Sequence, residues 1–115
     1  MDSIELARQI VDTIVNLKGE DILLLDFREV SILTDYFIIA SSLSERQARA
    51  IVGAIKQFTK KSHKLTPFCV DGDAASQWIV LDYGGVIVHI LTPQMRDYYD
   101  LEGLWQEAAV VLHML

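Results

Sequence analysis

The chain has 115 residues, of which 51% are hydrophobic and 23% are charged. This length fits one domain, and the composition is typical of a folded globular protein rather than a disordered one. The single cysteine, Cys69, excludes an internal disulfide, and we interpret it as a small core residue in a reducing compartment. No uncharged run approaches the ~20 residues of a membrane span, and no secretory signal opens the sequence, so we expect a cytoplasmic protein.

The net charge of −6 is concentrated in the last third of the chain. Residues 1–70 carry nine acids and nine bases, whereas residues 71–115 carry seven acids and one base, Arg96. Nucleic-acid binding depends on Lys and Arg side chains that neutralise phosphates, so this region repels nucleic acid. It should attract a basic protein surface instead.

The first half of the chain predicts two helices with two strands between them. Residues 1–20 have apolar side chains at helical spacing, followed by buried strands over 21–27 and 35–41. Ser44 and Gln47 form a capping box that opens a second amphipathic helix over 44–61. Residues 64–70 predict another strand, which we place at a sheet edge because Pro67 cannot donate a hydrogen bond.

A hairpin is the clearest local prediction. Strands over 78–82 and 86–91 flank a tight turn that contains Gly84 and Gly85. Successive side chains of a strand point to opposite faces, so the hairpin has one face made only of aliphatic residues, and this face should pack against the helices. The opposite face combines polar and apolar side chains, namely Trp78, Val80, Asp82, Ile87, His89 and Leu91.

The remaining residues predict a short helical turn and a final helix. The segment 95–105, "MRDYYDLEGLW", mixes acids with large aromatic rings, and residues 106–115 carry a stripe at helical spacing (Ala108, Val111, Leu112 and Leu115). We therefore expect an α/β fold. It should form a single compact domain over 1–115, with a mixed sheet of about five strands, helices on one face, and a C-terminal helical extension over 106–115.

The sequence offers only weak catalytic candidates. The three histidines lack metal-binding spacing, and a Cys69–His89 nucleophile pair on neighbouring strands is less favoured than a structural cysteine. Asp71 and Asp73 could hold magnesium opposite the start of the second helix, but no basic residue accompanies them and Gly72 favours a turn. We predict no catalytic residue, metal or cofactor. A nucleotidyltransferase-like enzyme and a structural homodimer stay open as alternatives.

The aromatic residues near the acids favour a protein interface. Tryptophan and tyrosine are the most frequent anchors of such interfaces, and an acidic rim suits a partner rich in Lys and Arg. For Leu101, Leu104 and Trp105, packing of the segment against the sheet is an equally good interpretation. For Tyr98, Tyr99, Asp100 and Glu102, the balance favours contact with a partner.

Two long stretches resemble the ribosomal silencing factor family, also called Iojap. They are "LTDYFIIASSLSERQARAI" (33–51) and "WIVLDYGGVIVHILTPQMRDYYDLEGLW" (78–105). The resemblance implies a domain with nucleotidyltransferase-like topology but no catalysis. It implies docking onto a ribosomal protein on the intersubunit face of the large subunit. That docking blocks subunit association and represses translation under nutrient limitation.

Matching the family motifs residue by residue implies a binding set. Its members are Trp78, Asp82, Tyr83, His89, Tyr98, Tyr99, Asp100 and Glu102. Two departures occur: Gly85 stands where the family commonly has an acid, and Ser42 stands where it has glycine. Eukaryotic relatives act in mitochondria and chloroplasts, but no Arg- and Ser-rich leader is present, so we expect the bacterial form. The implied partner is a ribosomal protein, with no membrane, little direct nucleic acid and a possible homodimer.

Overall fold

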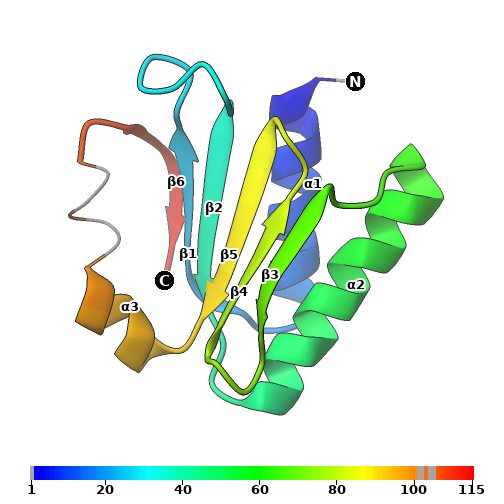
Figure 1. The fold of residues 1–115 in the computed structure, drawn as a ribbon, viewed down its shortest axis with the longest axis vertical. Helices are drawn as coiled ribbons and strands as arrows, with labels where there is room; N and C mark the ends of the chain where they lie inside the picture. Colours follow the sequence, from blue (N-terminus) through cyan, green and yellow to red (C-terminus); the bar gives the residue numbers. More distant parts are fainter. Residues whose placement is uncertain (1, 101–102, 104–105) are drawn as a thin grey trace.

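One mixed sheet organises the computed structural model, which describes residues 2–100, 103 and 106–115. Within these residues the strands are β1 (Glu20–Asp26), β2 (Tyr36–Ser41), β3 (Cys69–Asp73), β4 (Trp78–Asp82), β5 (Val86–Leu91) and β6 (Ala109–Met114). Their order across the sheet is β3-β4-β5-β2-β1-β6 (Figure 1). The β2–β5 pair is parallel and the other pairs are antiparallel. The α/β class and the mixed sheet are confirmed, with six strands rather than about five.

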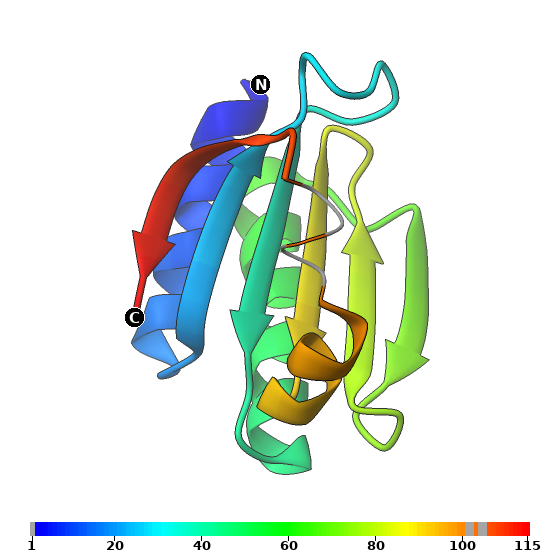
Figure 2. The same ribbon diagram turned by 90° about the vertical axis from the view of Figure 1, so that its left-hand side faces the viewer.

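The helices lie on both faces of the sheet rather than on one. Helices α1 (Ser3–Asn16) and α2 (Glu45–His63) cover one face, and the short α3 (Pro93–Tyr99) lies on the other (Figures 1 and 2). Our expectation of helices on a single face was therefore wrong. The chain returns to the far side after β5 because Thr92 and Pro93 start a new helix there, with the Thr92 hydroxyl accepting from the Met95 amide. Within the described ranges, no helix combines the length and apolar character that crossing a membrane requires.

The main core lies between the sheet and the two long helices. Asp2 caps the first turn of α1, and Ser44 caps the first turn of α2, as the Ser44–Gln47 pattern predicted. Each helix then points an aliphatic stripe at the sheet, and Ile14 and Ile55 are fully buried there. Leu81 and Val88 meet them from β4 and β5, also with no exposed surface. The purely aliphatic hairpin face thus packs against the helices, as expected.

The hairpin register is also confirmed. Trp78 pairs with Leu91, Val80 with His89, and Asp82 with Ile87, so these residues share the face on which α3 lies. Gly84 occupies the turn with φ +84°, a conformation that residues with a Cβ rarely adopt. The local pattern therefore fixes which side chains reach the second face.

The chain beyond residue 105 differs from our prediction. Residues 109–114 form an edge strand, β6, and not part of a helix. Leu24 of β1 pairs with Leu112, and Asp26 pairs with Ala109, so the strand satisfies the otherwise open edge of β1. The apolar spacing of this segment also fits a helix, but Val110 and Val111 are β-branched and favour a strand once a pairing edge is available.

The opposite edge strand, β3, corrects two further expectations. Cys69 is exposed rather than a core residue. The strand continues through Gly72, where we expected a turn, with Gly72 at φ +76° and opposite Ile79. A Cβ at Gly72 would meet the Trp78 carbonyl, so glycine is required for this approach.

Candidate protein-binding surface

A row of aromatic rings crosses the face of the sheet on which α3 lies. Neighbouring ring centroids are 4.1 to 6.1 Å apart. In order, the rings of this aromatic row are Phe27, Phe37, His89, Trp78, Tyr99 and Tyr98. The row begins with the buried Phe27 and ends with the most exposed ring, Tyr98, which is 80% exposed. The exposed rings of Tyr98 and Tyr99 are therefore packed, through the middle of the row, against its buried end, which restricts their movement.

A hydrogen bond between side chains fixes the centre of the row. The Trp78 indole N–H donates to Nδ1 of His89 at 3.2 Å. Because indole is only a donor, Nδ1 must be unprotonated, which places the imidazole proton on Nε2. Burial lowers the pKa of His89 to about 4, so the ring is neutral at pH 7. His89 thus orients Trp78 and carries no charge to a partner.

The exposed end of the surface lies on the last turn of α3. Tyr99 is 46% exposed and packs edge-on against Tyr98, with ring centroids 4.9 Å apart. Asp100 closes the helix in the left-handed conformation, and its carboxylate accepts from the Gly103 amide at 3.3 Å. Asp97 is also exposed on this helix. Two tyrosines and two carboxylates consequently lie within one short segment.

A buried arginine attaches α3 to the sheet. Arg96 is 4% exposed, and its guanidinium donates to the Asp21 carbonyl at 2.5 Å and to the Ser41 hydroxyl at 3.0 Å. The Asp21 carboxylate lies 3.8 Å from the same guanidinium and 2.6 Å from Nε2 of His113 on β6. These contacts tie α3, β1, β2 and β6 together. Sequence reasoning missed this role, since a lone arginine among acids indicates solvent exposure.

Further acids lie on the same face of the hairpin. Asp82 is half-buried and accepts from the Gly84 amide at 2.8 Å, while Asp71 is exposed and pairs with Val80. Because paired residues point to one side, both carboxylates lie on the face that carries Trp78. Asp71 and Asp97 therefore join the acidic rim, although neither belonged to the predicted set.

The structure brings most of the predicted residues together but separates Tyr83 from them. Trp78, His89 and Tyr99 are in contact through their rings. Tyr83 instead lies in the core beside α2, 7% exposed, with its hydroxyl 3.0 Å from that of Thr59. Burial raises the pKa of this phenol. Tyr83 cannot present its ring to a partner, and Glu102 lies outside the described residues.

The alternative catalytic arrangements are not assembled. Strand β4 separates Cys69 on β3 from His89 on β5, so the two are not on neighbouring strands as supposed. The Asp73 carboxylate accepts from the Ser76 amide at 2.8 Å and shapes the β3–β4 turn. In the part of the chain that the structure describes, no three His, Cys, Asp or Glu side chains converge as metal ligands.

Comparison with known proteins decides the family. The model of the family described as "Ribosomal silencing factor during starvation" matches residues 1–114. The chain belongs to the ribosomal silencing factor family. A family member from Chromobacterium violaceum is 31% identical over 105 residues, covering 91% of this chain and 85% of that protein. A crystal structure of a protein from the same organism superimposes with a TM-score of 0.86 at 28% identity, covering 97% of this chain and 94% of that one.

Another relative has a name that refers to mitochondria. The mouse protein named "Mitochondrial assembly of ribosomal large subunit protein 1" is 34% identical over 63% of this chain and 32% of that protein. The ribosomal silencing factor family is thus a family of ribosome-associated regulatory factors, and this chain is a member of it.

A side chain at position 85 would meet neighbours from α1 and from the β1–β2 loop. A Cβ at this position would meet the Ser3 hydroxyl and would lie 3.5 Å from the Asp35 carboxylate. An acidic side chain there would therefore approach another acid at close range, which raises the free energy of the folded state. Glycine avoids both contacts in this member of the ribosomal silencing factor family.

Proposed function

We propose that this chain binds a basic ribosomal protein on the intersubunit face of the large ribosomal subunit. Bound there, it blocks association of the small subunit and represses translation under nutrient limitation. One observation carries the proposal: the exposed tyrosine pair of α3 lies between two carboxylates on a helix held by a buried arginine.

The chemistry of this surface suits a protein rich in Lys and Arg. Tyr98 and Tyr99 provide large rings with few rotatable bonds, which lose little conformational entropy when a partner covers them. Asp97 and Asp100 give complementary charge, which accelerates association and rejects acidic partners. The same carboxylates repel ribosomal RNA, so the protein component of the subunit is the better match.

The relatives support the ribosomal target. The family description names ribosomal silencing during starvation, and the mouse relative's name contains assembly of the large ribosomal subunit. The domain measures 34 × 32 × 24 Å. Bound on the intersubunit face, a body of this size holds the two subunits apart. Exclusion by volume is then sufficient, and the proposed activity requires no catalytic residue.

Cosedimentation with purified large ribosomal subunits tests the proposal. The wild-type chain should pellet with large subunits and should reduce the amount of assembled ribosome when small subunits are added. Binding should weaken as salt rises from about 50 to 500 mM, because the charges at the rim are exposed to screening ions. A chain that never pellets with large subunits at low salt would contradict the proposed function.

Matched variants locate the contact. Tyr99→Ala and Asp97→Lys should each raise the dissociation constant about tenfold or more, the cost typical of an interface anchor or a reversed rim charge. Asp100→Lys should act in the same direction. Asp12→Lys, the same charge reversal on the exposed side of α1, serves as the control and should bind normally. Equal effects of the control and the α3 variants would show a general charge effect instead of a site.

A further inference from the structure

The loop between β1 and β2 exposes a group of large apolar side chains. Ile32 and Leu33 are 101% and 85% exposed, and Val30 is 42% exposed. Single exposed apolar residues are common on protein surfaces, but three within four positions at one loop tip are not. None of the contacts that stabilise the sheet requires these side chains. These exposed side chains are therefore candidates for contact with a partner.

The loop is held in shape by its own hydrogen bonds. The Phe27 amide donates to the Asp35 carbonyl at 2.7 Å and closes the neck of the loop. The Val30 and Ser31 amides both donate to the Phe27 carbonyl at 2.9 Å, and the Leu33 amide donates to the Ser31 hydroxyl at 3.0 Å. A loop organised in this way loses less conformational entropy on binding than a flexible one.

The loop is connected to the surface on α3 through the aromatic row. Phe27 at its neck is 4% exposed and stacks on Phe37 at 4.1 Å, the first contact of the row. In Figure 1 the loop bends over the side of the sheet on which α3 lies, away from α1 and α2. The loop and α3 thus lie toward opposite ends of the same side of the domain, so a partner that spans this side contacts both (Figures 1 and 2).

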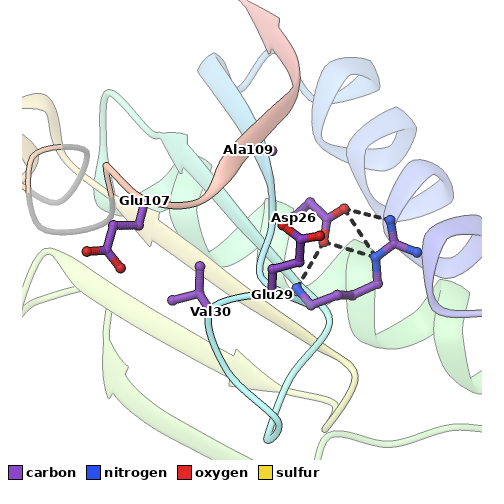
Figure 3. A pocket seen from close by; sticks show the side chains of 6 residues that line it. Asp26, Glu29, Val30, Glu107 and Ala109 are labelled. Carbon is purple, nitrogen blue, oxygen red and sulfur yellow. Dashed lines mark hydrogen bonds and ion pairs between the residues drawn. The ribbon is translucent and has the colours of Figure 1, made fainter.

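An acidic pocket of about 340 Å³ adjoins the loop. Its lining residues are Asp26, Arg28, Glu29, Val30, Glu107 and Ala109 (Figure 3). Asp26 and Arg28 neutralise each other at 2.7 Å, with the Arg28 side chain exposed and the Asp26 side chain only 19% exposed. Glu29 and Glu107 are exposed and make no ion pair within the described residues. The pocket keeps two negative charges in excess.

We propose that the β1–β2 loop is a second contact arm for the basic protein bound by α3. Ile32 and Leu33 cover an apolar part of that protein, and the adjoining pocket receives one of its Lys or Arg side chains between Glu29 and Glu107. This inference rests on the proposed function and extends it, because it assigns two separate contacts to one partner.

Charge favours this occupant over the other candidates. In a two-fold dimer formed through this surface, Glu29 and Glu107 of one copy would face the same acids of the other, and like charges at short range cost free energy. An anionic membrane surface would be repelled by the same carboxylates. A basic protein with an apolar patch is complementary to both the tip and the pocket.

Substitution of the loop tip tests the apolar contact. The double variant Ile32→Ser with Leu33→Ser should raise the dissociation constant for purified large ribosomal subunits about tenfold. Phe68→Ser is the matched control, since Phe68 is 82% exposed on the connection between α2 and β3. It should bind like the wild type. Melting temperatures of all three proteins should agree, because the substituted side chains are exposed.

Charge reversal tests the pocket independently. Glu29→Lys and Glu107→Lys should each weaken binding at low salt and flatten its dependence on salt concentration. Asp12→Lys again controls for the change in net charge. If a loop-tip variant unfolded, these two exposed reversals would still report on the pocket.

The possible outcomes separate the inference from the proposed function. Tenfold weaker binding by both sets of loop variants, with normal controls, supports the second arm. Binding within about twofold of wild type by the loop variants, while Tyr99→Ala binds poorly, overturns the arm and leaves the proposed function intact. Loss of self-association in the loop-tip variant without a change in subunit binding would identify a dimer contact and overturn the arm. A wild-type chain that does not bind large subunits overturns both.

Discussion

The two faces of the sheet use the same strands for different purposes. On the face covered by α1 and α2, the hairpin presents Ile79 and Leu81 to a closed aliphatic core. On the other face, the intervening residues of the same strand are Trp78, Val80 and Asp82, and α3 covers this side only in part. Side-chain alternation therefore separates the residues that stabilise the fold from those available for recognition.

The faces also differ in how their polar groups are satisfied. The aliphatic face has few polar groups to pair. The recognition face contains an indole bonded to an imidazole, and a buried guanidinium bonded to the Asp21 carbonyl. Buried polar groups of this kind hold side chains in defined positions and destabilise the fold strongly when one partner is removed. The recognition surface is thus held by these hydrogen bonds as well as by a second, smaller hydrophobic cluster, against which Trp78 and Met95 pack.

The largest effect on stability is expected on the aliphatic face. Leu81 is fully buried, so Leu81→Ala should lower the free energy of unfolding by roughly 4 kcal/mol through lost burial and a residual cavity. Urea unfolding measures this loss. The fraction that remains folded should bind large subunits with unchanged affinity. A parallel loss of affinity would show that the two faces are coupled more tightly than the contacts indicate.

The next effect is a pH dependence on the recognition face. His89 has a folded pKa of about 4, below its ordinary value of 6.5, so the unfolded chain binds more protons between these values. Stability from this group is complete above about pH 6.5 and is lost as pH falls toward 4. Over that window the wild type should lose up to about 3 kcal/mol more than His89→Gln, measured by urea unfolding at several pH values. Parallel pH profiles would show that His89 is hydrated in solution.

The smallest expected change in stability concerns the attachment of α3. Arg96→Met removes the donors to the Asp21 carbonyl and the Ser41 hydroxyl, and should cost about 2 kcal/mol. It should also weaken subunit binding, because Tyr98 and Tyr99 lose their fixed position. Arg96→Lys keeps a donor and should recover part of both losses. Normal binding by Arg96→Met would show that α3 does not need this attachment.

Local patterns predicted the hairpin and both long helices because their determinants lie within a few residues. The β6 strand escaped prediction for a nonlocal reason. Its apolar residues fit a helix as well as a strand, and the open edge of β1, more than eighty residues earlier in the chain, decides between them. The sequence does not show which strand will lack a partner.

The candidate site was predictable in part. Acids and aromatics in one segment identified the end of α3, but the same reasoning wrongly included Tyr83. Alternation was the missed signal: Tyr83 follows Ile79 and Leu81 in odd-numbered positions, which face the helices. The loop tip at Ile32 and Leu33 and the attachment through Arg96 depend on tertiary exposure and contact. Their sequence neighbours alone do not reveal these roles.

The register of the β4–β5 hairpin also constrains how this protein can evolve. Each residue of 78–82 has a fixed partner among residues 87–91. Inserting or deleting one residue within β4 would move every following side chain of the strand to the opposite face of the sheet. Carboxylates would then enter the aliphatic core, and aliphatic side chains would enter the recognition face. Substitutions that keep size and polarity are tolerable in this segment. Changes in its length are not, except at the Gly84–Gly85 turn, where an added residue leaves both strands in phase.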